Sequence, residues 1–161
     1  MKTTRIRFLL PLMMLMGFLF AACNGRDTLV DTYQELDNLK WTYIDKIRIP
    51  VKVEDASVGY VFYLNIRHTG DYKYSNIFVL IRQLNPDGTK FSERKEFTLA
   101  LPDGMWLGTG SGSLLDHQIP FRKGYHFPEK GTYIIELEQN MRDNPLRELS
   151  DIGLRIEKAS N

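Results

Sequence analysis

The sequence has few of the residues that cross-link chains or carry out covalent chemistry. Cys23 is its single cysteine among 161 residues, so no disulfide can form within one chain and no site can use several cysteines to bind zinc. If Cys23 is itself modified, no free thiol remains to act as a nucleophile. Stability must therefore come from packing.

Charge of one sign is also lacking. The whole chain has 21 basic and 20 acidic side chains. The first 22 residues hold three of the basic ones and no acidic one, which leaves residues 23–161 with 18 against 20, a net charge of −2. This balance gives no reason to expect nucleic acid or an electrostatically bound membrane surface as a partner.

Long hydrophobic runs are limited to the N-terminus. Lys2, Arg5 and Arg7 precede an apolar run over residues 8–22. A run of about 15 residues is shorter than the roughly 20 that span a bilayer, but it is normal for a secretory signal peptide. We therefore expect residues 1–22 to be cleaved.

The residues at the end of this run are typical of a bacterial lipobox. Ala21 and Ala22 place small side chains directly before Cys23, although Phe20 stands where a lipobox usually has Leu. The Cys23 thiol would take a diacylglycerol thioether, and its freed amine would take an N-acyl chain. Two alternatives remain: an ordinary secretory signal cleaved after Ala-x-Ala-like residues, or a transmembrane anchor. The lipobox predicts lipidation of Cys23, with no other cofactor.

The remaining chain predicts one domain. We expect a lipidated N-terminus and tether over residues 23–37 and a folded domain over residues 38–161. Tyrosine and phenylalanine are abundant, and the domain shows no helical periodicity beyond one possible turn at 146–149. Alternating or apolar runs, spaced about ten residues apart, predict strands at 41–44, 47–53, 59–68, 76–84, 90–99, 114–127, 132–139 and 152–156.

This pattern indicates an all-β protein, a single antiparallel β-sandwich of immunoglobulin-like or jelly-roll-like type. Pro50 places its strand at an edge or bulge. The charged residues 93–96 are typical of an edge strand, and residues 59–68 of a central one. Residues 101–112 are expected to form a long loop, and Tyr133 to pack at a corner of the sandwich.

Residues able to catalyse are scattered. His68, His117 and His126 lack the spacing of metal ligands, and Asp116 and His117 are neighbours on a strand, so they point to opposite faces. The glycine-rich residues 108–112 lack the ending of a phosphate loop. A hydrolase would need an acidic pair, for which Asp103, Asp116, Glu136 and Glu138 are the candidates. We expect no catalytic site, no metal and no enzyme activity.

Aromatic side chains offer a better candidate for binding. Tyr72, Tyr74 and Asn76 lie at the junction of two strands, and Trp106 lies in the long loop. Exposed tyrosine and tryptophan bind sugars or proteins well because a flat apolar face carries a polar group. These four residues are the candidate partner or ligand surface, with Tyr72 as the most exposed. Alternatively, Tyr74 and Trp106 close the open end of the sandwich.

Six segments, taken in order, resemble a known family, the gliding motility lipoprotein GldH of Bacteroidota. They are Tyr72 to Phe78, Asn85-Pro86-Asp87-Gly88, Asp103 to Gly108, Gly131-Thr132-Tyr133, Gln139 to Arg142 and Asp151 to Ile156. The likeness covers nearly all of the mature chain. It also implies a glycine after Asn144-Pro145-Leu146, where this chain has Arg147 and Glu148.

The resemblance implies an anchored accessory protein of the gliding apparatus, which is coupled in that phylum to type IX secretion, with other envelope proteins as partners. It brings no catalytic residue, and Cys23 is the one functional position that transfers. The expected location is the outer membrane on its periplasmic face, because Asn24-Gly25-Arg26-Asp27 holds one acidic residue; surface exposure is the alternative. A carbohydrate-binding envelope lipoprotein is the alternative function.

Overall fold

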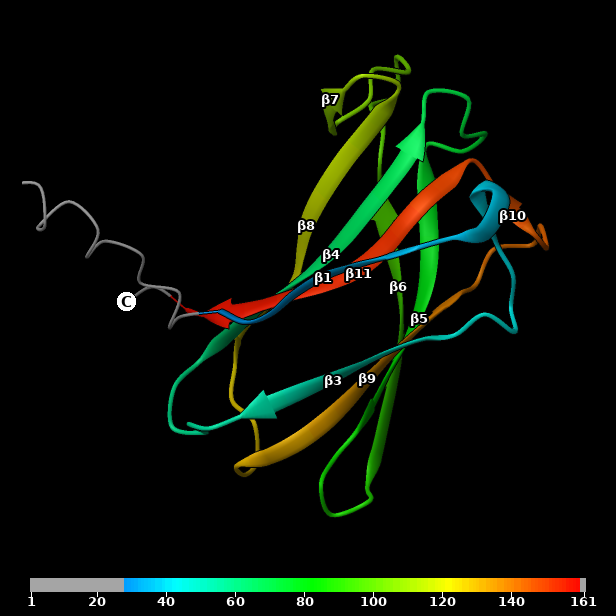
Figure 1. Cartoon of the computed structure of the whole chain (residues 1–161). Helices are drawn as coiled ribbons and strands as arrows, with labels where there is room; N and C mark the ends of the chain where they lie inside the picture. The colour runs from blue at the N-terminus through cyan, green and yellow to red at the C-terminus, as the bar shows by residue number, and fades with distance from the viewer. Residues whose placement is uncertain (1–27, 160–161) are drawn as a thin grey trace, which may run out of the picture.

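The computed structural model describes residues 28–159, which form two antiparallel β-sheets facing each other (Figure 1). The signal peptide, Cys23 and the first residues of the tether lie outside the described residues. The predicted antiparallel β-sandwich is confirmed. Among residues 28–159 no helix has the length and apolar character that a membrane span requires.

The first sheet has the strand order β1-β11-β4-β8-β7. Its strands are β1 (Thr28–Glu35), β4 (Tyr60–Thr69), β7 (Thr109–Ser111), β8 (Leu114–Tyr125) and β11 (Leu149–Lys158). The second sheet has the order β3-β9-β5-β6. Its strands are β3 (Ile47–Val53), β5 (Asn76–Leu84), β6 (Lys90–Thr98) and β9 (Gly131–Gln139). A 3-10 turn, η2 (Asp37–Leu39), precedes the short pair β2 (Lys40–Trp41) and β10 (Leu146–Arg147).

The core follows from the period of two in the strands. In β3 every second residue, from Ile47 to Val53, is buried, while the residues between them are exposed. The same alternation in β5 and β9 covers the inner face of the second sheet. Trp41, Tyr60 and Tyr133 are among the largest fully buried side chains.

Most predicted strand positions are confirmed. Pro50 lies in β3, an edge strand that pairs with β9 alone, and the charged residues 93–96 lie in β6, the opposite edge. β4 is central in its sheet. The Tyr133 hydroxyl donates to the carbonyl of Glu129 at 2.8 Å, four residues upstream, which is the hydrogen bond of a tyrosine corner.

Four predictions of detail were wrong. The tether ends earlier than residue 37, because residues 28–35 form β1, whose polar composition hid it. The predicted loop over 101–112 contains β7, and the predicted turn of helix over 146–149 is instead β10. The closing strand β11 has ten residues and lies inside the first sheet, between β1 and β4.

The strand directions define two ends of the sandwich. Thr28 pairs with Glu157, and Glu157 pairs with Val61, so β1 begins at the end where β4 begins. We call this the Thr28 end. The opposite end, here the far end, carries five connecting segments, residues 36–46, 70–75, 99–108, 112–113 and 140–145. Figure 1 shows them on the side away from the start of β1.

Candidate functional site

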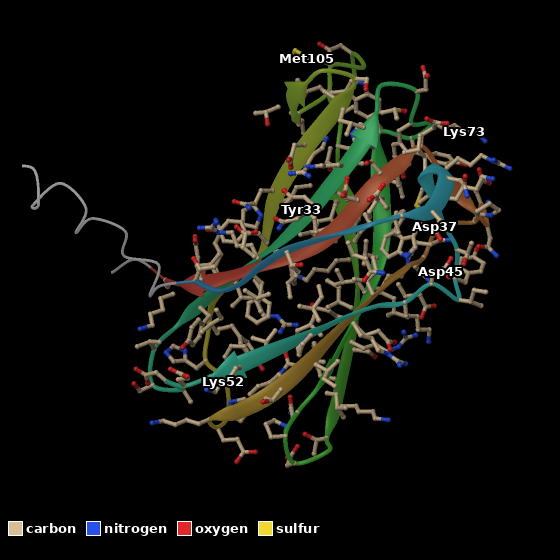
Figure 2. The ribbon with its side chains drawn as sticks, viewed as in Figure 1. Tyr33, Asp37, Asp45, Lys52, Lys73 and Met105 are labelled. Carbon is tan, nitrogen blue, oxygen red and sulfur yellow. The ribbon has the colours of Figure 1, made fainter. Side chains whose placement is uncertain are left out.

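Backbone hydrogen bonds join the connections at the far end to one another. The amides of Leu99 and Ala100 both donate to the carbonyl of Ser75, which ties the β6–β7 connection to the β4–β5 connection. The Leu101 amide donates to the carbonyl of Met105, so the β6–β7 connection folds back on itself. Figure 2 shows Met105 and Lys73 at this end and Lys52 at the other.

Two buried histidines lie beneath these connections. Nε2 of His68 in β4 and Nε2 of His117 in β8 are 2.9 Å apart, and both side chains are buried. Nδ1 of His68 lies 2.7 Å from the carbonyl oxygen of Thr69, so Nδ1 must carry the proton. Nε2 of His68 therefore accepts the hydrogen bond between the two rings, and Nε2 of His117 donates it. Both rings are neutral.

Burial reinforces this neutrality. It lowers the pKa of His68, and it lowers the pKa of His117 to about 4, with the neighbouring His68 acting in the same direction. The Trp106 ring packs edge-on against His68 at 4.5 Å between centroids. Gly108 leaves room for His117, since an added Cβ would lie 2.5 Å from its Nε2. The two histidines therefore form a structural contact that is buried beneath the far-end connections.

The predicted surface residues lie close together, but most of their rings face inward. Tyr72 is 4% exposed, so the prediction that it is the most exposed of them was wrong. Its ring lies 5.3 Å from His68 and 6.4 Å from Trp106, because the β4–β5 connection turns back over the core. Trp106 and Tyr74 are half-buried against that core, as the alternative interpretation held.

The remaining polar groups of this set are engaged within the chain. The Tyr74 hydroxyl donates to Asp143 at 2.6 Å, and the Asn76 side-chain amide donates to Glu96 at 2.6 Å. A stacking platform made of Tyr72, Tyr74 and Trp106 is therefore absent, since the Tyr72 ring is covered. Whether these residues contact a partner remains a prediction.

A cleft of about 510 Å³ opens beside Tyr74 at the far end. Its walls come from the β4–β5 and β9–β10 connections. Its charged side chains are Asp71, Lys73, Arg142, Asp143, Arg147 and Glu148. Aromatic residues alone do not predict this cleft, because charged residues in a sequence are usually solvated. The one signal in the sequence is Arg142, the last residue of the fifth segment that resembles the family.

Hydrogen bonds hold the wall formed by residues 141–148 in place. The Tyr43 hydroxyl donates to the carbonyl of Met141 at 2.6 Å, and its amide donates to the side chain of Asn144. The Thr69 hydroxyl donates to Glu148 at 2.6 Å. Hydrogen bonding from Tyr74 lowers the pKa of the Asp143 carboxyl, which stays ionised. The cleft is thus preformed.

The predicted separation of Asp116 from His117 is confirmed. His117 points into the core, whereas Asp116 lies on the outer face of the first sheet. There Asp116 accepts from the Tyr33 hydroxyl and from Nε of Arg67, each at 2.8 Å. Burial, followed by the bond to Asp116, raises the pKa of Tyr33 to about 12. Asp116 joins β1, β4 and β8 and is not part of a dyad.

Two of the acidic candidates, Glu136 and Glu138, lie side by side on the outer face of the second sheet. Arg82 donates to both, and Lys46 approaches both. Burial acts against ionisation, but hydrogen bonds from Arg48 and Arg82 outweigh it and lower the pKa of Glu136. In the part of the chain that the structure describes, no three His, Cys, Asp or Glu side chains gather as metal ligands.

Comparison with known proteins now decides the family. The model of the family described as GldH lipoprotein matches residues 28–156, which is nearly the whole described chain. The chain belongs to the GldH lipoprotein family. The resemblance predicted from six segments is confirmed.

Two curated relatives of the GldH family match over nearly their full lengths. "Gliding motility lipoprotein GldH homolog" of Christiangramia forsetii is 29% identical over 150 residues, covering 89% of this chain and 91% of the relative. "Gliding motility lipoprotein GldH" of Flavobacterium johnsoniae is 23% identical over 154 residues, covering 91% and 94%. No solved structure matches the chain.

One segment that resembles the GldH family, and one position where the chain departs from it, now have a structural reason. The glycine expected after Leu146 corresponds to a left-handed backbone, since Glu148 has a φ of 68°. Gly153 has another role: a Cβ there would overlap the carbonyl oxygen of Thr32, because β1 passes close over β11. Family segments therefore mark tight backbone positions as well as surfaces.

Proposed function

We propose that this protein is a lipid-anchored, non-enzymatic envelope protein that contacts other components of the gliding or type IX secretion machinery through its far end. Family membership supports the lipoprotein assignment, and the names of both relatives refer to gliding motility. The lipobox supports Cys23 as the attachment point, with a diacylglycerol and an N-acyl chain.

The observation that carries the proposal is the distribution of exposed apolar side chains. Five large hydrophobic residues in the described chain are exposed: Leu39, Ile44, Phe91, Met105 and Leu107. All but Phe91 lie on far-end segments. Ile44 is 86% exposed and follows Tyr43, which is hydrogen bonded to the wall of the cleft. Exposed apolar side chains are unfavourable in water, and four of these five lie on the connections of one end, which favours protein contacts there.

The position of the predicted lipid attachment at Cys23 also favours the far end as the contact surface. Thr28 is five positions after Cys23, and at about 3.5 Å per residue this stretch reaches roughly 17 Å at most. The Thr28 end therefore stays near the lipid. β4 has ten residues, which span about 34 Å, so the far end points away from the membrane.

A non-enzymatic role is supported by the state of the candidate groups. His68 and His117 are neutral and sealed, Asp116 is bound by Arg67 and Tyr33, and the paired glutamates are ion-paired with Arg48 and Arg82. We place the domain on the periplasmic face of the outer membrane, as its residues after Cys23 predict. The identities of neighbouring proteins, captured by cross-linking in intact cells, report which face it occupies.

Exposed apolar residues allow a matched test. The triple variant Ile44→Ser, Met105→Ser, Leu107→Ser should reduce co-purification of gliding or secretion components about tenfold after cross-linking in intact cells, because interface anchors contribute about 2 kcal/mol or more. Phe91→Ser, which removes a comparably exposed residue outside the far end, should leave recovery unchanged. Equal recovery with the triple variant, or equal loss with Phe91→Ser, would refute the proposal.

A further inference from the structure

Two arginines stand on the rim of the far-end cleft without an ionic partner in residues 28–159. Arg142 and Arg147 are both exposed, and neither is in an ion pair with a described residue. Two carboxylates of the rim are already bound within the chain. Asp143 accepts from Tyr74 and lies 3.5 Å from the ammonium group of Lys73, and Glu148 accepts from Thr69. The cleft has as many acidic as basic side chains, and Arg142 and Arg147 are the two of its cations that no described carboxylate pairs with.

The surroundings of these arginines are rigid. Tyr43 binds the backbone on the Arg142 side of the wall, and the amide of Thr69 donates to the carbonyl of Glu148, next to Arg147, at 3.0 Å. Arg147 itself belongs to β10, which pairs with β2. Because the backbone on both sides is fixed, less ordering is required when a ligand binds.

Carboxylate is the anion that these groups suit best in this position. A guanidinium group presents a planar set of donors that matches a carboxylate in bidentate fashion. The volume of about 510 Å³ lies within the usual range for a pocket that receives a few residues or a small ligand. A lipid headgroup fits poorly, since the cleft is at the end opposite Thr28.

A sugar also fits poorly, because the aromatic faces beside the cleft are occupied. The ring of Tyr74 packs against Tyr72 at 5.9 Å and carries the ammonium group of Lys73 at 5.1 Å. We infer that the far-end cleft binds an acidic peptide segment of an envelope partner, with Arg142 and Arg147 receiving its carboxylates. This inference rests on the proposed function and names the chemistry of the partner.

Asp71 supplies a variant that acts in the opposite direction. It is the third carboxylate of the rim, is exposed, and forms no ion pair with a described residue. Its negative charge opposes an acidic ligand. Asp71→Asn should therefore strengthen binding about twofold to threefold, as expected for the removal of one exposed like charge.

The binding assay uses the full chain as cells produce it, purified in a mild detergent, and a fluorescein-labelled hexaglutamate peptide. Fluorescence anisotropy at about 50 mM salt, where screening is weak, should show binding that hexaglutamine does not match. The double variant Arg142→Gln, Arg147→Gln should weaken hexaglutamate binding about tenfold or more. Hydrogen exchange should show that the peptide protects residues 140–148 in the unaltered chain.

A control with the same change of net charge separates a site from a general charge effect. Lys90→Gln, Lys130→Gln removes two exposed cations, one at the start of β6 and one in the β8–β9 connection, and it should leave binding unchanged. Equal weakening by both double variants, hexaglutamine binding as tightly as hexaglutamate, or arginine-dependent binding to phosphatidylglycerol vesicles in place of the peptide would overturn the inference. None of these results affects co-purification through Ile44, Met105 and Leu107, so the proposed function is tested separately.

Discussion

The two buried histidines beneath the far end are uncharged. One hydrogen bond joins His68 to His117, and the carbonyl of Thr69 fixes the tautomer of the first ring. No carboxylate contacts either ring within the described chain, so a proton added to the pair would be a buried, uncompensated charge. Protonation of the pair should therefore lower the stability of the fold at acid pH.

The direction of this effect follows from the lowered pKa of His117. The unfolded residue takes up a proton near pH 6.5, whereas the folded residue does so only near pH 4. Above pH 6.5 both states are neutral and stability is complete; as the pH falls from 6.5 to 4, the unfolded state gains protons and stability is lost. The loss should reach about 2–3 kcal/mol, measured by urea unfolding at a series of pH values.

Carboxylates also titrate in this window, so the comparison must be between variants. His117→Gln keeps an amide donor towards His68 and should remove most of the histidine contribution, giving a flatter curve. His126→Gln changes an exposed histidine and should give the curve of the unaltered protein. A curve for His117→Gln as steep as that of the unaltered protein would show that the pair does not govern acid stability.

The environments of individual side chains are the least predictable part of the molecule. Tyr72 was favoured because tyrosine in a polar segment is usually exposed, but the connection after β4 folds back and covers it with Trp106 and His68. Arg142 and Arg147 were not singled out, because an unpaired charge can be recognised only when its neighbours are known. The contact between His68 and His117, 49 residues apart, depends on the register of β4 and β8.

β1 joins the anchored N-terminus to the sandwich, and its fit depends on one residue of its neighbour. Asn65, on the outer face of β4, is fully buried because its side chain donates to Asp31 and to the carbonyl of Thr32 in β1. β1 reaches this position by passing close over Gly153. From β1, Tyr33 then reaches Asp116 in β8.

Gly153→Ala should displace β1. Its Cβ would overlap the Thr32 carbonyl, which is backbone and cannot rotate away. We expect a loss of about 2 kcal/mol or more in the free energy of unfolding, with faster hydrogen exchange in β1 than in β5. Gly70→Ala, which meets no atom within 4 Å, should change stability by less than about 0.5 kcal/mol. Similar small effects for both variants would mean that Gly153 does not position β1.

Strands were predictable where the alternation was strong, and not elsewhere. β3, β5 and β9 alternate apolar inner residues with polar or charged ones, so their positions could be read directly. β1 contains Asp31, Thr32 and Gln34, and its membership of a sheet is decided by pairing with β11. β7 and β10 have three and two residues, too few for any period to show.

The proposed function assigns a different role to each end of the sandwich. The Thr28 end lies within roughly 17 Å of the predicted lipid attachment, while the far end carries four of the five exposed apolar residues of the described chain and a cleft with two arginines that no described carboxylate pairs with. The sheets between them keep these ends about 34 Å apart. Under the proposed function, the far end is the contact surface and the sheets set its distance from the Thr28 end.

Site-specific photo-cross-linking in intact cells tests this arrangement most directly. A benzoyl-phenylalanine residue is placed at Met105 or Ile44 at the far end, and at Lys52 or Phe91 as controls, all exposed positions. Adducts are identified by mass spectrometry. The account predicts adducts with gliding or secretion components from Met105 and Ile44 and not from the controls. Adducts with those components from Lys52 or Phe91 alone would contradict it.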